Sequence, residues 1–268
     1  MNFIPADPCG FSLMIAGRRA LVCGSSAGLG RGCALALARA GVKVTLNGRS
    51  EAPLQQAAAD IGAQTGQAIN YVVGDVTTTE GRREVLARCP DPDILITNAQ
   101  GPPPGDFRNF GEHDWQEAVR LSMITPIMLI QATIDAMVAR KWGRIINITS
   151  SAVKAPLPLL HLSNGARSGL TGFIAGLARE VAIYGVTINN LLPGRFDTDR
   201  LRSYIDKLAA RDGVSAEEAA RRLCDANPMK RLGRPEEFGA FAAFIASAHA
   251  GYLTAQNILL DGGEYQGL

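Results

Sequence analysis

The stretch Cys23-Gly-Ser-Ser-Ala-Gly-Leu-Gly30 decides the fold, because it joins a short apolar run to a helical pattern. Residues 20–23 have the composition of a buried strand, and residues 30–40 have the periodicity of a helix. Three glycines of the stretch allow a tight turn: Gly24, Gly28 and Gly30. Such a turn brings backbone N–H groups and a helix N-terminus close to a pyrophosphate. The stretch therefore predicts nucleotide binding, with a plain glycine-rich turn as the alternative.

Short apolar runs and longer helical patterns alternate along the rest of the chain. Further strands are expected near residues 42–46, 68–73, 94–97, 144–148, 187–191 and 256–260. The longest helices are expected at 114–140 and 163–184. Parallel strands joined by crossover helices need this spacing. The predicted fold class is therefore α/β, with one doubly wound parallel sheet of about seven strands and helices on both faces.

Domain organisation follows from composition. No shift in composition marks a linker, so residues 1–268 are predicted to form a single domain. Residues 1–12, with two prolines and a glycine, are expected to be an extended arm. Residues 198–226 are helical and amphipathic, and we expect them to cover a substrate.

Charge and cysteine usage exclude several classes of partner. Lys and Arg total 27 against 25 Asp and Glu, which gives no electrostatic reason to expect nucleic acid or an anionic membrane as a partner. The longest apolar region, 123–139, is interrupted by Pro126, Gln131 and Asp135, so no membrane helix is expected. The five cysteines show no metal spacing and are predicted to be free thiols in the cytoplasm, with no metal site.

The end of the second predicted strand bears on which dinucleotide binds. A carboxylate there would accept hydrogen bonds from the adenosine ribose and select NAD. This chain has Asn47-Gly48-Arg49 instead, with no carboxylate before Glu51. Gly48 leaves room, and Arg49 offers a planar fork for a 2′-phosphate. We expect NADP rather than NAD, with an ordinary solvated arginine as the alternative.

Six segments together carry a resemblance to a known family: the glycine-rich turn, Gly74-Asp-Val76, Asn98-Ala99, Gly143-Arg-Ile-Ile-Asn-Ile-Thr-Ser150, Pro193-Gly194 with Thr198, and Asp261-Gly-Gly263. With them the chain resembles the short-chain dehydrogenase/reductase family in its single-domain form. Within that family, these segments most resemble those of 3-oxoacyl carrier-protein reductases. Gln100 stands where the family's Asn-Ala-Gly segment has its glycine.

The resemblance implies a seven-stranded Rossmann sheet, hydride transfer to a carbonyl, and usually a homotetramer. It places Asp75 at the adenine and Thr198 at the nicotinamide amide. The cofactor-binding residues it implies here are Gly24, Ser26, Gly28, Leu29, Gly30, Arg49, Asp75, Val76, Asn98, Ala99, Arg167, Pro193, Gly194 and Thr198. A homotetramer or homodimer would be built on the two long helices, the second of which has glycines at positions 165, 169, 172 and 176.

The family's catalytic positions are occupied differently in this chain. The family has a Tyr thirteen residues after an active-site Ser and a Lys four residues further on. Ser150 keeps the Ser position, but Ser163 and Arg167 stand at the other two. The family's Asn, seven residues after Trp115, is Ser122 here. We expect Ser150, Ser163 and Arg167 to form an altered catalytic site.

The altered site changes the expected proton chemistry. A phenol starts near a pKa of about 10 and a neighbouring cation lowers it, whereas an alkyl hydroxyl is a far weaker acid. Arg167 can hold ribose hydroxyls but does not release protons easily. His161 is a candidate replacement acid, with a loop or interface histidine as the alternative. Arg195 faces either an anionic substrate or a structural partner, Asp197 or Asp199.

Three functions remain open from the sequence. The first is an NADP-dependent oxidoreductase with an atypical proton donor, acting on a small-to-medium carbonyl or alcohol. The second is a cofactor-binding but non-catalytic family member. The third is a non-redox enzyme, an isomerase or a lyase, that uses the same pocket.

Overall fold

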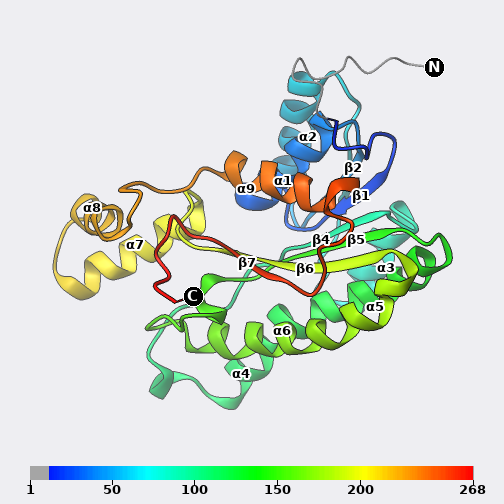
Figure 1. The fold of residues 1–268 in the computed structure, drawn as a ribbon. Helices are drawn as coiled ribbons and strands as arrows, with labels where there is room; N and C mark the ends of the chain where they lie inside the picture. The colour runs from blue at the N-terminus through cyan, green and yellow to red at the C-terminus, as the bar shows by residue number, and fades with distance from the viewer. Residues whose placement is uncertain (1–11, 268) are drawn as a thin grey trace.

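A seven-stranded parallel sheet organises residues 12–267, the part of the chain described by the computed structural model (Figure 1). The strands are β1 (Arg19–Val22), β2 (Lys43–Gly48), β3 (Asn70–Val73), β4 (Ile94–Thr97), β5 (Gly143–Ile148), β6 (Val186–Pro193) and β7 (Asn257–Leu260). They lie in the order β3-β2-β1-β4-β5-β6-β7, and every neighbouring pair is parallel. The predicted α/β class and doubly wound sheet are confirmed. The extended arm expected at 1–12 lies outside the described residues, apart from Ser12.

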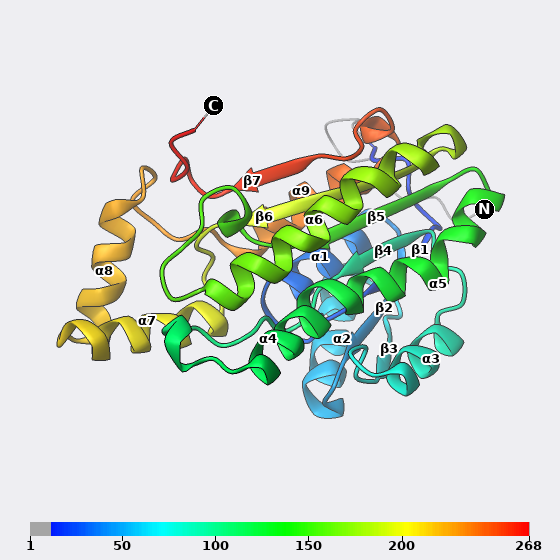
Figure 2. The same ribbon diagram turned by 90° about the horizontal axis from the view of Figure 1, so that it is seen from below.

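Helices cover both faces of the sheet, as Figures 1 and 2 show. One face carries α1 (Gly28–Arg39), α2 (Glu51–Thr65) and α9 (Pro235–Ala246). The other carries α3 (Thr79–Arg88), α4 (Glu112–Val119), α5 (Thr125–Ala139) and α6 (His161–Val181). Side chains alternate across a strand, so Ala20 and Val22 of β1 join the core beneath α1 and α9. Leu21 and Cys23 join the core beneath α5 and α6.

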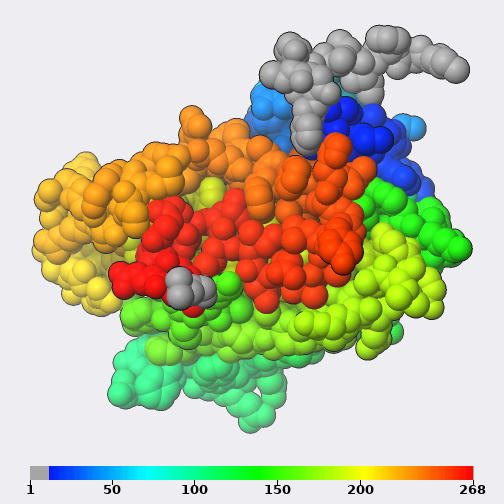
Figure 3. Space-filling view, in the orientation of Figure 1, coloured from blue at the N-terminus to red at the C-terminus, as the bar shows by residue number. Residues whose placement is uncertain are grey.

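Two further helices, α7 (Asp199–Asp212) and α8 (Ala216–Ala226), follow β6 and project beyond the carboxyl ends of the strands (Figure 2). The sequence indicated helical structure over 198–226, and a turn at Gly213 (φ +65°) divides it into these two helices. In Figure 3 the C-terminal segment runs across the molecule between α9 and the helices of the opposite face.

The first long helix differs from the expected continuous helix over 114–140. It begins at Glu112 and contains a π-helical turn, Arg120–Ile124, between α4 and α5. Thr125 Oγ1 donates to the Arg120 carbonyl oxygen at 2.8 Å within this turn. π-turns are rare and occur often at functional sites, and this one contains Ser122.

The helical stretch Glu112–Ala139 is long and apolar enough to cross a membrane by length and composition. Leu129, Ile130 and Met137 of α5 are buried in the core beneath the sheet. A core helix meets the same criterion, so the stretch is weak evidence for a membrane span.

Candidate cofactor and substrate site

The crevice at the carboxyl ends of β1 and β4 is the natural ligand site of this topology. The chain leaves β1 toward β2 and β3 on one side, and then crosses over to β4 on the other. Ligands of open α/β sheets bind at such a reversal. The glycine-rich turn follows β1, and Asn98-Ala99 follows β4, so two of the predicted segments meet here.

The glycine-rich turn is held against Asn98. Asn98 Nδ2 donates to the Gly24 carbonyl oxygen at 3.1 Å. Gly24 has φ +56°, and a Cβ there would lie 2.8 Å from Asn98 Nδ2. A Cβ on Gly30 would lie 2.2 Å from the Gly24 carbonyl oxygen. This closeness of backbone to backbone explains why both positions are glycine.

The N-terminus of α1 is free to bind an anion. The helix starts at Gly28, its N-cap Ala27 provides no side-chain hydrogen bond, and its first turn has no acidic residue. The first N–H groups of a helix have no partner within the helix, and the helix dipole favours negative charge there. Thr198, whose hydroxyl accepts from Leu201 N at 3.3 Å and caps α7, closes the other side, with Cγ2 3.3 Å from a Cβ built on Gly28. The turn therefore fits the pyrophosphate of a dinucleotide.

A bridge that the sequence did not predict lies at the end of the crevice beside β2. Arg49 Nη2, just beyond β2, donates to Gln100 Oε1, beyond β4, at 2.6 Å. Because β2 and β4 flank β1, this bond crosses the carboxyl end of β1. Within residues 12–267 no carboxylate forms an ion pair with Arg49, so its charge is available to a ligand.

Asp75 lies at the same end and is anchored by its neighbour. Its Oδ1 accepts from Thr77 N at 2.9 Å and from Thr77 Oγ1 at 2.7 Å. Burial acts to raise the pKa of Asp75, but these bonds and the charges of Arg49 and Arg120 hold it below its usual value. Asp75 is therefore an ionised acceptor with one oxygen already used.

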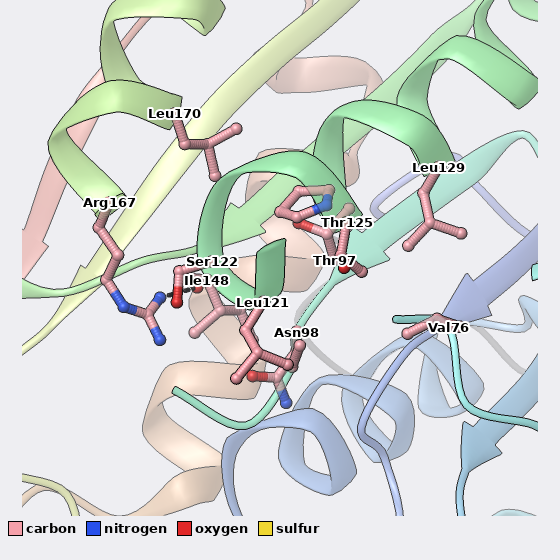
Figure 4. A pocket seen from close by; sticks show the side chains of 12 residues that line it. Val76, Thr97, Asn98, Leu121, Ser122, Thr125, Leu129, Ile148, Arg167 and Leu170 are labelled. Carbon is pink, nitrogen blue, oxygen red and sulfur yellow. Dashed lines mark hydrogen bonds between the residues drawn. The ribbon is translucent and has the colours of Figure 1, made fainter. Parts of the chain in front are cut away.

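At the opposite end of the crevice, the guanidinium of Arg167, which Figure 4 shows, forms two hydrogen bonds. Its Nε donates to Ser163 Oγ at 3.1 Å and its Nη1 to the Ile148 carbonyl oxygen at 2.9 Å. Burial, together with the smaller effect of the positive charge of Arg200, lowers the pKa of Arg167 to about 10. Ser150 lies beyond β5, where its Oγ accepts from Ala152 N at 3.1 Å.

A small cavity lies between Arg167 and the π-turn. It is lined by Val76, Thr97, Asn98, Ser122, Ile148 and Arg167, among others. Ser122 Oγ is buried and has no hydrogen-bond partner among the residues that the structure describes. Figure 4 shows the Arg167 guanidinium directed toward Ser122 and Ile148. A buried hydroxyl without a partner is costly, so a ligand or water that reaches this cavity would gain a bond there.

A row of buried polar side chains supports the strand ends below the site. Thr97 Oγ1 donates to Asn147 Oδ1 at 2.6 Å, and Asn147 Nδ2 donates to Asn190 Oδ1 at 3.0 Å. Asn190 Nδ2 then donates to Asn257 Oδ1 at 2.8 Å. This row links β4 to β7, and the sequence analysis missed it. Asparagine at three strand positions was the available signal.

His161 and Arg195 are placed away from the Arg167 hydrogen bonds. The His161 ring packs edge-on against Phe107, with ring centroids 5.6 Å apart, at the start of α6. Arg195 forms an ion pair with Glu264 at 2.7 Å. Arg195 therefore has a structural partner, as one of the two alternatives expected. That partner is Glu264, so the predicted partners Asp197 and Asp199 were wrong. Asp197 and Asp199 pair with Arg202 instead.

Pro193 and Gly194 end β6 at the rim of the site. Gly194 N donates to the Leu260 carbonyl oxygen at 2.9 Å, and a Cβ there would lie 2.7 Å from Asp261. The sequence analysis also missed Arg200, at the start of α7. Its Nη1 and Nη2 donate to the carbonyl oxygens of Gly101 (3.1 Å) and Pro102 (3.3 Å).

The chain matches the sequence model of the short chain dehydrogenases over residues 18–209. It belongs to the short-chain dehydrogenase/reductase family. Among curated relatives, the NADPH-dependent reductase BacG of Bacillus subtilis is 29% identical over 256 residues, covering 94% of this chain and 99% of the relative. The 3-oxoacyl-[acyl-carrier-protein] reductase FabG of Escherichia coli is 32% identical over 257 residues, covering 93% and 98%.

A solved structure extends the likeness to the whole fold. L-sorbose reductase from Gluconobacter frateurii, complexed with NADPH and L-sorbose, superposes with a TM-score of 0.90 at 27% identity, covering 96% of this chain and 100% of that one. The chain is thus an NAD(P)-dependent oxidoreductase of this family, and the site residues described above fit such a cofactor.

Proposed function

We propose that the protein is an NADP(H)-dependent oxidoreductase that reduces a small-to-medium carbonyl compound with a proton donor other than tyrosine. One observation carries this proposal: the guanidinium of Arg167 is fixed between the Ser163 hydroxyl and the Ile148 carbonyl beside the cofactor crevice. Two relatives support the choice of NADP, because their names or titles state NADPH. Arg49, without an acidic partner at the end of β2, supports it independently.

Different residues would bind the cofactor and activate the carbonyl group at the two ends of the crevice. The α1 N-terminus and the glycine-rich turn would hold the pyrophosphate, Arg49 a 2′-phosphate, and Asp75 the adenine. NADPH supplies the hydride when it is bound. Ser150 and Ser163 would donate hydrogen bonds to a carbonyl oxygen of the substrate. The positive charge of Arg167 stabilises negative charge that develops on that oxygen or on Ser163 Oγ.

Arg167 itself is a poor proton donor at neutral pH. Its pKa of about 10 is lower than usual for arginine but still keeps it protonated. Loss of a positioned general acid typically costs about 10²–10⁴ in rate. We therefore expect slow turnover, with Ser163 passing on a proton from solvent, and His161 as the alternative donor should the loop around Phe107 rearrange.

A spectrophotometric assay of NADPH oxidation across a panel of ketones, aldehydes and oxo acids tests the proposal. Ser163→Ala should lower turnover, while His161→Ala should leave it within about threefold. Ser168→Ala is the matched control, because Ser168 is an exposed serine on the same helix. Loss of turnover in His161→Ala with normal turnover in Ser163→Ala would move the proton donor to His161. Absence of turnover with every carbonyl would contradict an oxidoreductase role.

The hydrogen bonds of Arg167 to Ser163 and Ile148 also support a second candidate function, a family member that binds the cofactor without turnover. The Arg167–Ser163–Ile148 arrangement contains no group that titrates near neutral pH. Tight NADPH binding without oxidation of the cofactor by any carbonyl would favour this candidate. Conversion of a substrate with no net change in NADPH would favour an isomerase or lyase.

Three broader expectations belong to this proposal: one domain over 1–268, a cytoplasmic location, and a homotetramer or homodimer. The oligomer rests on the exposed part of α6. Gly165 and Gly169 pack within the chain, since Cβ atoms there would contact Trp115 at 3.4 Å and Met123 Sδ at 2.8 Å. Cβ atoms on the other two glycines of the series, at 172 and 176, would meet nothing within 4 Å. That half of the series is open to a second copy.

A further inference from the structure

Two arginines from different helices converge on one point at the rim of the site. A Cβ built on Gly101 would lie 2.8 Å from Arg200 Nη2 and 3.0 Å from Arg167 Nη2. Arg167 lies on α6 and Arg200 on α7, and the two arginines are 33 positions apart in the sequence. Their guanidinium groups therefore approach the same loop from two sides, and glycine at 101 leaves space for both.

Neither positive charge is neutralised. Among residues 12–267, no carboxylate forms an ion pair with Arg167 or Arg200. The neighbouring arginines behave differently, because Arg195 pairs with Glu264 and Arg202 pairs with Asp197 and Asp199. The two guanidinium groups donate to neutral oxygens, a hydroxyl and three backbone carbonyls, in the part of the chain that the structure describes.

Both arginines retain N–H donors that form no hydrogen bond within the described part of the chain. A guanidinium has five N–H donors. Arg167 uses Nε and Nη1, which leaves both hydrogens of Nη2 free. Arg200 uses one bond from each terminal nitrogen and is exposed at the rim, so a ligand can reach it. Two adjacent cations with free donors repel each other unless an anion lies between or beside them.

We propose that Arg167 and Arg200 together bind an oxyanion of the substrate, a carboxylate or a phosphate, and thereby select anionic carbonyl compounds. The inference rests on the proposed function, because it concerns the substrate of the same site. The planar forks of two arginines match the paired oxygens of such a group. The contacts of Arg167 to Ser163 and Ile148 place this anion beside the altered catalytic positions. The cofactor pyrophosphate would bind elsewhere, at the N-terminus of α1 and the glycine-rich turn that Asn98 holds.

Matched acids and esters test the proposal in steady-state assays with NADPH: acetoacetate against methyl acetoacetate, and levulinate against methyl levulinate. The acid should be preferred in kcat/KM. Arg200→Met should raise KM for the acid by about 10- to 100-fold, the value of a hydrogen bond to a charged group, and change KM for the ester by less than threefold. Arg200→Lys, which keeps the charge but loses the fork, should give an intermediate KM. Arg202→Met is the control, since Arg202 lies on the same helix but already has carboxylate partners.

A binding measurement decides the question without turnover. Malonate and inorganic phosphate are titrated calorimetrically into protein saturated with NADP⁺. Binding by the unmodified protein and by Arg202→Met, with a 10- to 100-fold weakening in Arg200→Met, supports the proposal. The proposal is overturned if neither malonate nor phosphate binds, or if the acid and its ester have equal kcat/KM. A higher Kd for NADPH in Arg200→Met with unchanged anion binding also overturns it and assigns Arg200 to the cofactor. Failure of all carbonyl turnover would reject the proposed function alone, because the calorimetric result stands by itself.

Discussion

Arg49→Ala should weaken binding of NADPH much more than binding of NADH. Arg49 follows Gly48 at the end of β2, where no carboxylate competes for an adenosine ribose. Its guanidinium is held by a neutral partner, Gln100 Oε1, at 2.6 Å. The 2′-phosphate that distinguishes NADPH from NADH is the group that such a fork would bind.

The size of the effect follows from two opposing contributions. A hydrogen bond to a charged group contributes about 1.5–3 kcal/mol, and the neutral-acceptor bond to Gln100 about 0.5–1.5 kcal/mol. When NADPH binds, Arg49 gains the bond to the 2′-phosphate. It either gives up its bond to Gln100 or keeps both bonds. The net loss in Arg49→Ala is therefore about 1.5–3 kcal/mol if Arg49 keeps its bond to Gln100 and up to about 2.5 kcal/mol if it gives that bond up, or up to roughly 150-fold in Kd. NADH has no 2′-phosphate, so its Kd should change by less than about threefold.

Fluorescence titration of both reduced cofactors measures the effect. Arg39→Ala is a matched control, because Arg39 Nη2 also donates to a glutamine, Gln64 Oε1, at 3.0 Å but lies away from the crevice. Gln100→Ala should tighten NADPH binding, because it releases the Arg49 guanidinium. Equal affinity of the unmodified protein for the two cofactors, or equal weakening of both in Arg49→Ala, would refute the reasoning.

Three other predictions concern the turn, the altered site and the assembly. Gly30→Ala should lower the free energy of unfolding by about 1–3 kcal/mol through overpacking and abolish cofactor binding. Gly165→Ala, with only an ordinary contact at 3.4 Å, should cost no stability; equal losses in denaturant titrations would contradict this. Ser163→Tyr with Arg167→Lys should raise ketone turnover by up to about 10²–10⁴, and an unchanged kcat would count against the altered-site account. Light scattering at micromolar concentration should give a dimer or tetramer, and a monomeric mass would reject the oligomer.

The sheet was predictable because its determinants are local. Short apolar runs between helical patterns set the strands, and the glycine-rich turn fixed the first β–α unit. Boundaries shifted where a local signal was missing. The strand expected at 68–73 begins at Asn70, and the helix expected at 163–184 spans 161–181 with a 3₁₀ turn after it. The π-turn at 120–124 left no sequence signal, because its residues are ordinary helix formers.

The sequence predicted the parts of the site that motifs specify. It did not predict which ion pairs and hydrogen bonds the charged side chains form. Gly24, Gly30 and Asn98 meet as their motif indicates. Arg195, by contrast, was expected to face either an anionic substrate or a nearby carboxylate, Asp197 or Asp199, and it pairs with Glu264, 69 positions away. Arg200 belongs to no motif of the sequence, so the sequence did not single it out, and Asp197 was considered only as a partner of Arg195. In the structure that carboxylate pairs with Arg202. Such choices depend on tertiary packing, which residue spacing does not encode.

Hydride transfer from NADPH to the carbonyl carbon can be followed with a deuterium label. The protein is incubated with NADPH that carries deuterium at the transferred position of the nicotinamide, together with an accepted carbonyl compound. The account predicts one deuterium on the carbinol carbon of the product, with one NADP⁺ formed per product, and a much lower rate in Ser163→Ala. Product without deuterium, or bound NADPH that is never oxidised, would contradict it.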